Sequence, residues 1–264
     1  MKMIYRLFFV AALSLVGVNS LSAAPAINAD SLWDAANTLY VNGDYKGAVA
    51  LYEDIEEAGL VSYDLFYNLG NAYFKDDQLG EAIVAYRKAQ LLNPSDADVE
   101  YNLAVANSYT KDRLNVVPTF FLTRWVRAVA DLFSGKVWAT LSLIFLVLAA
   151  AGLLLFLLAH ALPRRKWGLG VAVVSALMFV VSLCFMSSAV AKINKGAEAV
   201  IVAESASVKS SPDRASIDLF ILHEGTVVEV VTDFGDWNEI LLSDGSKGWI
   251  RGEQIKRVSF RSDE

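Results

Sequence analysis

Hydrophobic residues gather in three long blocks along the chain, and none of these blocks contains Asp, Glu, Lys or Arg. The blocks are residues 7–18, 137–162 and 167–191. The first block follows Lys2 and Arg6 and precedes a run of small residues, which is the order of a secretory signal peptide. We therefore predict a signal peptide over residues 1–23. An uncleaved anchor helix is the alternative, and both interpretations export the chain that follows.

The second and third blocks are each long enough to cross a lipid bilayer as a helix. About 25 residues at 1.5 Å per residue span about 37 Å, more than the hydrocarbon core of about 30 Å. We predict transmembrane helices over 137–162 and 167–191, joined by a loop over 163–166 that carries Arg164, Arg165 and Lys166. Positive charge in a short loop favours the cytoplasmic side. With an exported N-terminus, both aqueous domains of this multi-pass protein would be periplasmic, in a bacterial inner membrane.

Residues 113–136, before the first predicted span, alternate large apolar side chains with charges near helical spacing. Phe121, Trp125 and Phe133 fall on the apolar side, with Arg124 and Arg127 between them. This pattern is typical of an amphipathic helix that lies in the membrane interface with a Trp anchor. A helix packed on the N-terminal domain is the alternative.

Residues 30–112 contain an internal repeat with a period of about 34 residues. Ala48 and Tyr52 recur as Ala82 and Tyr86, with small residues where helices would approach and an aromatic residue one turn later. This period and residue pattern predict tetratricopeptide (TPR) repeats, built from pairs of helices. A last helix that ends near Tyr109 is expected to cap the stack.

The repeat phase predicts which side chains line the concave groove of such a stack. The predicted partner-binding residues are Trp33, Asn37, Tyr40, Tyr67, Asn68, Asn71, Phe74 and Tyr101, with Asn102 beside them. Trp33, Asp98 and Asn102 stand where TPR modules that capture a carboxylate carry basic residues. We therefore expect an apolar or extended peptide rather than a C-terminal carboxylate. Alternatively, several of the aromatic residues pack against the membrane-proximal segment.

Residues 198–258 change to short apolar runs separated by turn signals, which predicts five or six strands in a small barrel. The runs resemble the bacterial SH3 (SH3b) domain through Val208-Lys209-Ser210-Ser211-Pro212, Leu222-His223-Glu224-Gly225 and Gly248-Trp249-Ile250. The resemblance implies a groove that binds cell-wall peptides or protein segments. Phe234, Trp237 and Trp249 could line it, although Trp237 could equally fill the core. The predicted fold class is thus a multidomain membrane protein with an α-helical TPR solenoid, a two-helix transmembrane hairpin and a small all-β SH3-like barrel.

Charge and residue types restrict the chemistry that the chain can perform. Between residues 26 and 112 there are 15 acidic and 5 basic residues, a net charge of −10 that disfavours nucleic acid. The only cysteine, Cys184, lies in the third apolar block, so an intrachain disulfide is excluded. No catalytic or metal-binding motif surrounds His160 or His223, and a solvated position is expected for His223. We therefore expect no catalytic residues, no metal and no cofactor, and a protein that is not an enzyme.

The order of signal peptide, short TPR, basic-loop hairpin and SH3b resembles the BatE-like membrane proteins of the Bacteroides aerotolerance family. The segments that carry this resemblance best are Arg113-Leu114-Asn115-Val116-Val117-Pro118 and Leu219-Phe220-Ile221-Leu222-His223-Glu224-Gly225. The resemblance implies a role in envelope assembly or stress tolerance. It also implies partners: membrane proteins with von Willebrand A domains and a MoxR-type AAA+ ATPase system.

Two functions follow from these patterns. The first is a membrane-anchored scaffold or adaptor that binds protein partners through both modules. The second is an envelope sensor or tether whose SH3b domain binds peptidoglycan. The second ranks lower because residues 198–258 hold 11 acidic against 6 basic residues, and anionic wall material favours a basic surface.

Overall fold

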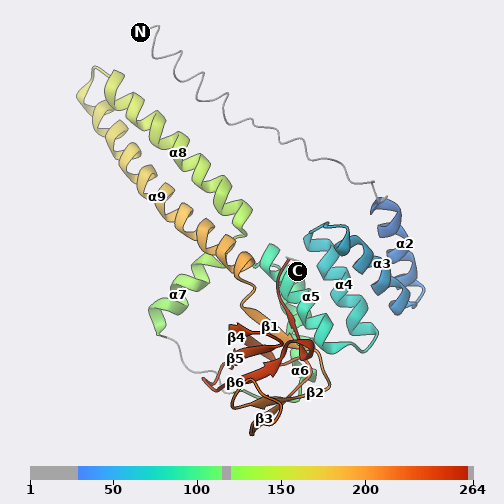
Figure 1. Cartoon of the computed structure of the whole chain (residues 1–264). Helices are drawn as coiled ribbons and strands as arrows, with labels where there is room; N and C mark the ends of the chain where they lie inside the picture. The colour runs from blue at the N-terminus through green and yellow to red at the C-terminus, as the bar shows by residue number, and fades with distance from the viewer. Residues whose placement is uncertain (1–28, 115–119, 261–264) are drawn as a thin grey trace.

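The computed structural model describes residues 29–114 and 120–260, and the predicted signal peptide lies outside them. Three parts follow each other along the described chain: a stack of short helices, a long helical hairpin and a β-sheet (Figure 1). The hairpin projects away from the other two parts, which lie side by side at its base.

Five helices form the stack, and the period of the repeat sets their spacing. They are α2 (Ala29–Val41), α3 (Tyr45–Glu57), α4 (Tyr63–Lys75), α5 (Leu79–Leu92) and α6 (Ala97–Tyr109). Side-chain oxygens of Asp44, Ser62 and Asp96 cap the N-termini of α3, α4 and α6. Ala48 and Ala82 are fully buried, as the period predicts, because small residues let adjacent helices approach closely.

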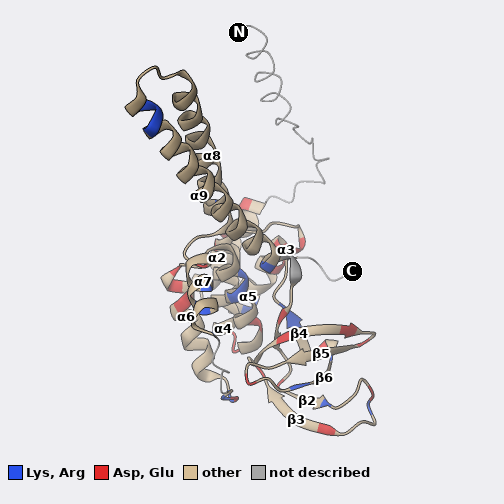
Figure 2. Cartoon of the chain, turned by 90° about the vertical axis from the view of Figure 1, so that its left-hand side faces the viewer, with Lys and Arg blue, Asp and Glu red and all other residues tan. Residues whose placement is uncertain are grey.

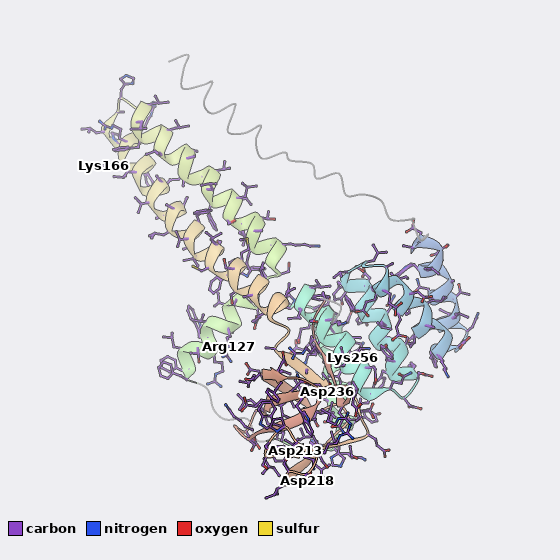
Figure 3. The ribbon with its side chains drawn as sticks, in the orientation of Figure 1. Arg127, Lys166, Asp213, Asp218, Asp236 and Lys256 are labelled. Carbon is purple, nitrogen blue, oxygen red and sulfur yellow. The ribbon has the colours of Figure 1, made fainter. Side chains whose placement is uncertain are left out.

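The hairpin consists of α8 (Gly135–Leu158) and α9 (Leu162–Lys195), which are long and apolar enough to cross a membrane. The predicted loop over 163–166 needs correction, because α9 begins at Leu162 and residues 163–166 form its first turn. Proline is favoured in the first turn of a helix, where its missing N–H group is not needed. Arg164, Arg165 and Lys166, in the first turn of α9, remain at the far tip of the hairpin (Figures 2 and 3). Lys136, Lys192 and Lys195 lie at the opposite ends of the two helices, and the apolar shaft between carries no charged residue.

Glycines let the two hairpin helices touch backbone to backbone. A Cβ atom added to Gly152 would lie 2.6 Å from the amide nitrogen of Ala172, and one added to Gly168 would lie 2.6 Å from that of Phe156. Small residues at such crossings are the usual device for packing helices in lipid, where hydrophobic association is lost.

Helix α7 (Phe121–Ala130) lies at the base of the hairpin, inside the predicted amphipathic segment 113–136, of which residues 115–119 lie outside the described chain. None of its residues is buried, and Trp125 is 64% exposed. Lys192 of α9 pairs with Asp131 at the end of α7 over 2.5 Å. A cavity of about 740 Å³ lies between α7, the end of α5 and the sheet. The interfacial position of this helix stays a prediction.

Seven strands form one antiparallel sheet that does not close on itself. The prediction of a small barrel with five or six strands is therefore wrong in both the number of strands and the closure. In sequence order they are β1 (Glu198–Ile201), β2 (Ser205–Lys209), β3 (Asp218–His223), β4 (Val227–Phe234), β5 (Trp237–Leu241), β6 (Lys247–Arg251) and β7 (Ile255–Arg257). The spatial order is β3-β2-β6-β5-β4-β1-β7, so β3 and β7 form open edges. Strands β1 and β7 pack against α5. This helix therefore covers the β7 edge, which in a closed barrel would pair with another strand.

The repeats and the sheet share a hydrophobic core instead of folding as separate modules. Val200 and Val258 belong to the core of the repeats, and the ring of Phe260 packs on that of Phe66 with 5.3 Å between centroids. A Cβ atom on Gly80 would lie 2.8 Å from the carbonyl oxygen of Ile201, so α5 and the sheet meet without a gap. Repeats and sheet therefore form one unit at the base of the hairpin.

Candidate functional site

Helices α2, α4 and α6 are the first helices of the repeats, which line the concave surface in stacks of this class. A ladder of asparagines joins these three helices. Nδ2 of Asn68 donates to Oδ1 of Asn37 over 3.4 Å, which links α4 to α2. Nδ2 of Asn102 donates to Oδ1 of Asn71 over 3.0 Å, which links α6 to α4. Asn71 and Asn102 stand one repeat after Asn37 and Asn68, so each repeat makes the same connection.

Tyrosines of the second helices complete this ladder. The hydroxyl of Tyr52 donates to Oδ1 of Asn37 over 2.6 Å, and that of Tyr86 donates to Oδ1 of Asn71 over 2.8 Å. Burial raises the pKa of Tyr52 to about 12, against a lowering effect of Asn68, so its hydroxyl keeps the proton that it donates. The carbonyl oxygens of Asn37 and Asn71 thus serve the fold, a role that the sequence analysis missed. The signal for it was the recurrence of the same Tyr and Asn residues in both copies of the repeat.

The predicted groove aromatics are held in place by other aromatic rings. Tyr67 stacks on Tyr63 with 5.9 Å between centroids, and Trp33 meets the edge of Tyr52 at 5.6 Å. Phe74 meets Tyr109 at 5.7 Å, and Tyr40 meets Tyr45 at 5.4 Å. Paired rings lose little side-chain entropy when a ligand binds, because their orientation is already fixed.

The structure therefore brings the predicted groove residues together on three adjacent helices. All are half-buried except Tyr101, which is 70% exposed on α6. The ring contacts and hydrogen bonds of these residues go to other residues of the repeats. Their role in partner binding stays a prediction.

The three predicted aromatics of the sheet share its outward face. Phe234 of β4 lies opposite Trp237 of β5, and its ring meets that of Trp249 at 6.3 Å. The neighbouring residues Asn238 and Ile250 are buried on the inward face, as strand alternation requires. Trp237 is half-buried on the outward face, so it does not fill the core. These side chains form an aromatic patch on the sheet.

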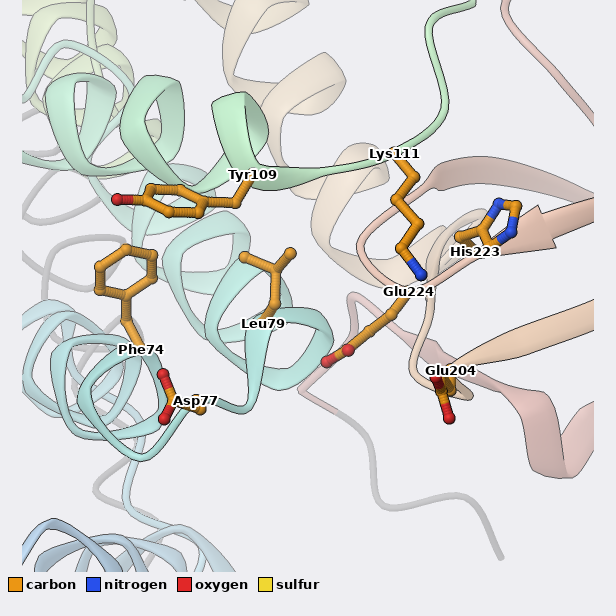
Figure 4. A pocket seen from close by; sticks show the side chains of 8 residues that line it. All are labelled: Phe74, Asp77, Leu79, Tyr109, Lys111, Glu204, His223 and Glu224. Atoms are coloured by element: carbon orange, nitrogen blue, oxygen red, sulfur yellow. The ribbon is translucent and has the colours of Figure 1, made fainter.

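A pocket of about 390 Å³ continues the end of the groove to the sheet (Figure 4). Phe74 and Tyr109 form one side of it, and Lys111, Glu204, His223 and Glu224 lie toward the other. The pocket thus combines two aromatic rings from the repeats with charged side chains from the junction. It was not predicted, because its walls come from segments that lie far apart in the sequence.

Asp112 ties the end of the repeats to the sheet at this pocket. Its carboxylate accepts hydrogen bonds from the backbone N–H of His223 and the hydroxyl of Thr226, both over 2.7 Å, and contacts Nδ1 of His223 at 2.8 Å. Burial alone would raise the pKa of Asp112, but the bonds from Thr226 and His223 outweigh burial and lower it. The expected solvated position of His223 is therefore wrong: its ring is half-buried and held by Asp112.

A second link fixes the other side of the same junction. The backbone N–H of Gly80, at the start of α5, donates to Oε1 of Glu224 over 2.8 Å. Arg87 lies 3.2 Å from Glu198, although the orientation of the two groups does not make a hydrogen bond. These links keep the groove and the aromatic patch in a fixed relation to each other.

Comparison with known protein families identifies the helical part. Residues 63–96, which contain α4 and α5, match the tetratricopeptide repeat. This match confirms the prediction for the second copy of the period, and the chain contains a helical repeat region of this class. No curated protein matches the chain significantly.

Proposed function

We propose that this protein is a non-catalytic adaptor, anchored in the bacterial inner membrane by α8 and α9, with the repeats and the sheet on the periplasmic side. The observation that carries the proposal is a tetratricopeptide repeat with aromatic and asparagine side chains along α2, α4 and α6, on a unit that is joined to an apolar hairpin. Tetratricopeptide repeats present concave surfaces to other proteins, so protein partners are the ligands that this architecture suits.

The chemistry of the groove supports a peptide ligand. Its aromatic rings offer apolar contacts, and its asparagine amides offer hydrogen bonds to a peptide backbone. The resemblance to BatE-like proteins favours partners in the same membrane, namely proteins with von Willebrand A domains and a MoxR-type AAA+ ATPase system. On this proposal the complex contributes to aerotolerance or stress tolerance of the cell envelope.

Photo-cross-linking in intact membranes tests this proposal on the full chain. A photoreactive amino acid replaces Tyr101, which is exposed on groove helix α6. We expect adducts with integral membrane proteins, identified by mass spectrometry. The matched control carries the same photoreactive residue at Ala50, which is exposed on α3, a second helix outside the groove. Equal adducts at the two positions, or none at Tyr101, contradict binding in the groove.

A second candidate function rests on the aromatic patch of Phe234, Trp237 and Trp249. SH3b-like proteins use such patches for cell-wall peptides, so the alternative is a peptidoglycan-binding sensor or tether. The full chain in detergent should then sediment with purified cell-wall sacculi, and Trp249→Ala should abolish the sedimentation. Sedimentation that survives this substitution would exclude the patch as the binding surface.

A further inference from the structure

The groove carries a repeated pair of residues, and only the aromatic member of each pair is among the predicted partner-binding residues. Each groove helix begins with an aspartate that is followed one helical turn later by an aromatic residue. These pairs are Asp30 with Trp33, Asp64 with Tyr67, and Asp98 with Tyr101, and each pair stands one repeat after the one before. Residues three apart lie on the same side of a helix, so each carboxylate stands one turn from its ring.

The three aspartates are free to meet a ligand. All are exposed in the first turn of their helices, and none forms a salt bridge with a residue that the structure describes. The groove helices α2, α4 and α6 hold five acidic residues in all and one basic residue, Lys75, at the far end of α4. A negative field therefore covers the start of the groove with no counter-charge beside it.

A carboxylate beside an aromatic face is a suitable receptor for a guanidinium or ammonium group. The carboxylate supplies charge and hydrogen-bond acceptors, and the ring supplies a cation–π contact over its face. An anionic or neutral side chain gains neither contribution. The paired arrangement thus selects the sign of the charge that the ligand must carry.

The spacing of the helices sets the spacing of the charges. Side-chain hydrogen bonds join α2 to α4 and α4 to α6. Helices in side-chain contact lie about 10 Å apart, and an extended peptide advances about 3.3–3.6 Å per residue. One step from a groove helix to the next therefore corresponds to about three residues of an extended ligand. The asparagine ladder between the aspartate–aromatic pairs and the far end of the groove offers amides to the backbone of that ligand.

We propose that the groove recognises an extended segment of a partner protein with a basic side chain at about every third residue. This inference rests on the proposed function, because it names the partner chemistry of the same groove. Each Lys or Arg side chain enters one aspartate–aromatic pair, and the segment crosses α2, α4 and α6 in turn.

The test uses the full chain in detergent and three fluorescent peptides with blocked ends. Their repeating units are Arg-Ala-Ala, Gln-Ala-Ala and Glu-Ala-Ala, four units each, and binding is measured by fluorescence anisotropy. We expect the arginine peptide to bind and the other two to bind at least about tenfold more weakly. Binding of the arginine peptide should also weaken as salt rises, since exposed ion pairs are screened.

Matched variants separate the groove from the overall acidity of the protein. The triple substitution Asp30→Asn, Asp64→Asn and Asp98→Asn should weaken binding of the arginine peptide by about tenfold or more, because three ion pairs are lost together. The control changes three exposed acidic residues outside the groove, Asp54→Asn, Glu57→Gln and Asp236→Asn, for the same change in net charge. It should bind within about twofold of the parent. Circular dichroism establishes that both variants keep their helices.

Two results would overturn the inference. One is a glutamine peptide that binds as tightly as the arginine peptide, since the groove would then not select charge. The other is an equal effect of both triple variants, since general attraction would then explain the binding. If either occurs while photoadducts at Tyr101 persist, the adaptor function survives and only the preference for a basic segment fails.

Discussion

The hydroxyl of Tyr86 donates a hydrogen bond to Oδ1 of Asn71 over 2.8 Å, and Tyr52 makes the same bond to Asn37 one repeat earlier. Each bond ties a second helix of a repeat to the groove side of its first helix. The buried tyrosine hydroxyls of the second helices thus hold the asparagines of the groove helices in place. A substitution at Tyr86 should therefore lower the stability of the fold more than it lowers the affinity for a partner.

Tyr86→Phe should lower the free energy of unfolding by about 1 kcal/mol, the net value of a typical hydrogen bond. The ring stays buried at 2% exposure, so packing is retained and only the donor is lost. Thermal unfolding of the full chain in detergent measures the effect. Tyr101→Phe, at a 70% exposed position, is the control and should leave the unfolding temperature unchanged. Equal shifts in the two variants would contradict a structural role for the ladder.

The junction at Asp112 should make the contact between repeats and sheet sensitive to acid. The pKa of Asp112 is lowered in the folded state, so its stabilising contribution is complete above its unfolded pKa of about 3.9. The contribution is lost as the pH falls through the lower folded value. Stability of the parent should therefore decline below about pH 4, and that of Asp112→Asn should be lower at pH 7 but decline less steeply. Asp236→Asn, which alters an exposed carboxylate, should follow the parent at every pH.

The periodic part of the fold could be predicted from the sequence because its information is local. The period of the repeat sets both the helix pairs and the face that each residue occupies, and residues 63–96 match the repeat in question. Ala48, Tyr52, Ala82 and Tyr86 are all buried as the period requires. The two apolar helices could likewise be predicted, since their length and composition alone define them.

The junction could not be predicted because it depends on contacts between distant segments. Asp112 and His223 are 111 residues apart, and no local pattern marks them as a pair. The open sheet has the same origin, since Val200 and Val258 turn toward the repeats and remove the need to close a barrel. The start of α9 differs from the prediction because Pro163 is compatible both with a loop and with the first turn of a helix, and the sequence alone does not distinguish the two.

The sign of the stability change caused by Gly80→Ala shows whether the contact between α5 and the sheet or the helix propensity of alanine dominates at this position. In a free helix, alanine in place of glycine adds about 1 kcal/mol of stability. Here the new Cβ atom would lie 2.8 Å from the carbonyl oxygen of Ile201, and overpacking against backbone typically costs about 1–3 kcal/mol. We expect a lower unfolding temperature and faster proteolysis between the repeats and the sheet. A variant that is more stable than the parent would mean that the two parts separate readily.

The proposed orientation predicts which positions a membrane-impermeant maleimide reaches in spheroplasts. In a Cys184→Ser background, Asp236→Cys on the sheet should be labelled from outside. Arg165→Cys at the tip of the hairpin should be labelled only after the membrane is opened. Labelling of Arg165→Cys in intact spheroplasts would place the basic tip outside and reverse the proposed topology.

Two glycines on α9 offer a matched test of how the hairpin is held together. A Cβ atom on Gly168 would lie 2.6 Å from the amide nitrogen of Phe156 and 2.8 Å from the carbonyl oxygen of Gly152, so Gly168→Ala must push α8 and α9 apart. A Cβ atom on Gly170, a little further along the same helix, would meet nothing within 4 Å. Both substitutions raise helix propensity equally, so a difference between them reports only the contact.

Gly168→Ala should therefore lower the unfolding temperature in detergent and widen the distance distribution between spin labels on α8 and α9. Gly170→Ala should leave both measurements unchanged. The labels are introduced in the Cys184→Ser background, which removes the only native thiol. Equal behaviour of the two variants would show that backbone contact at Gly168 does not hold the helices. The hairpin would then depend on the lipid and on the packing of its larger side chains.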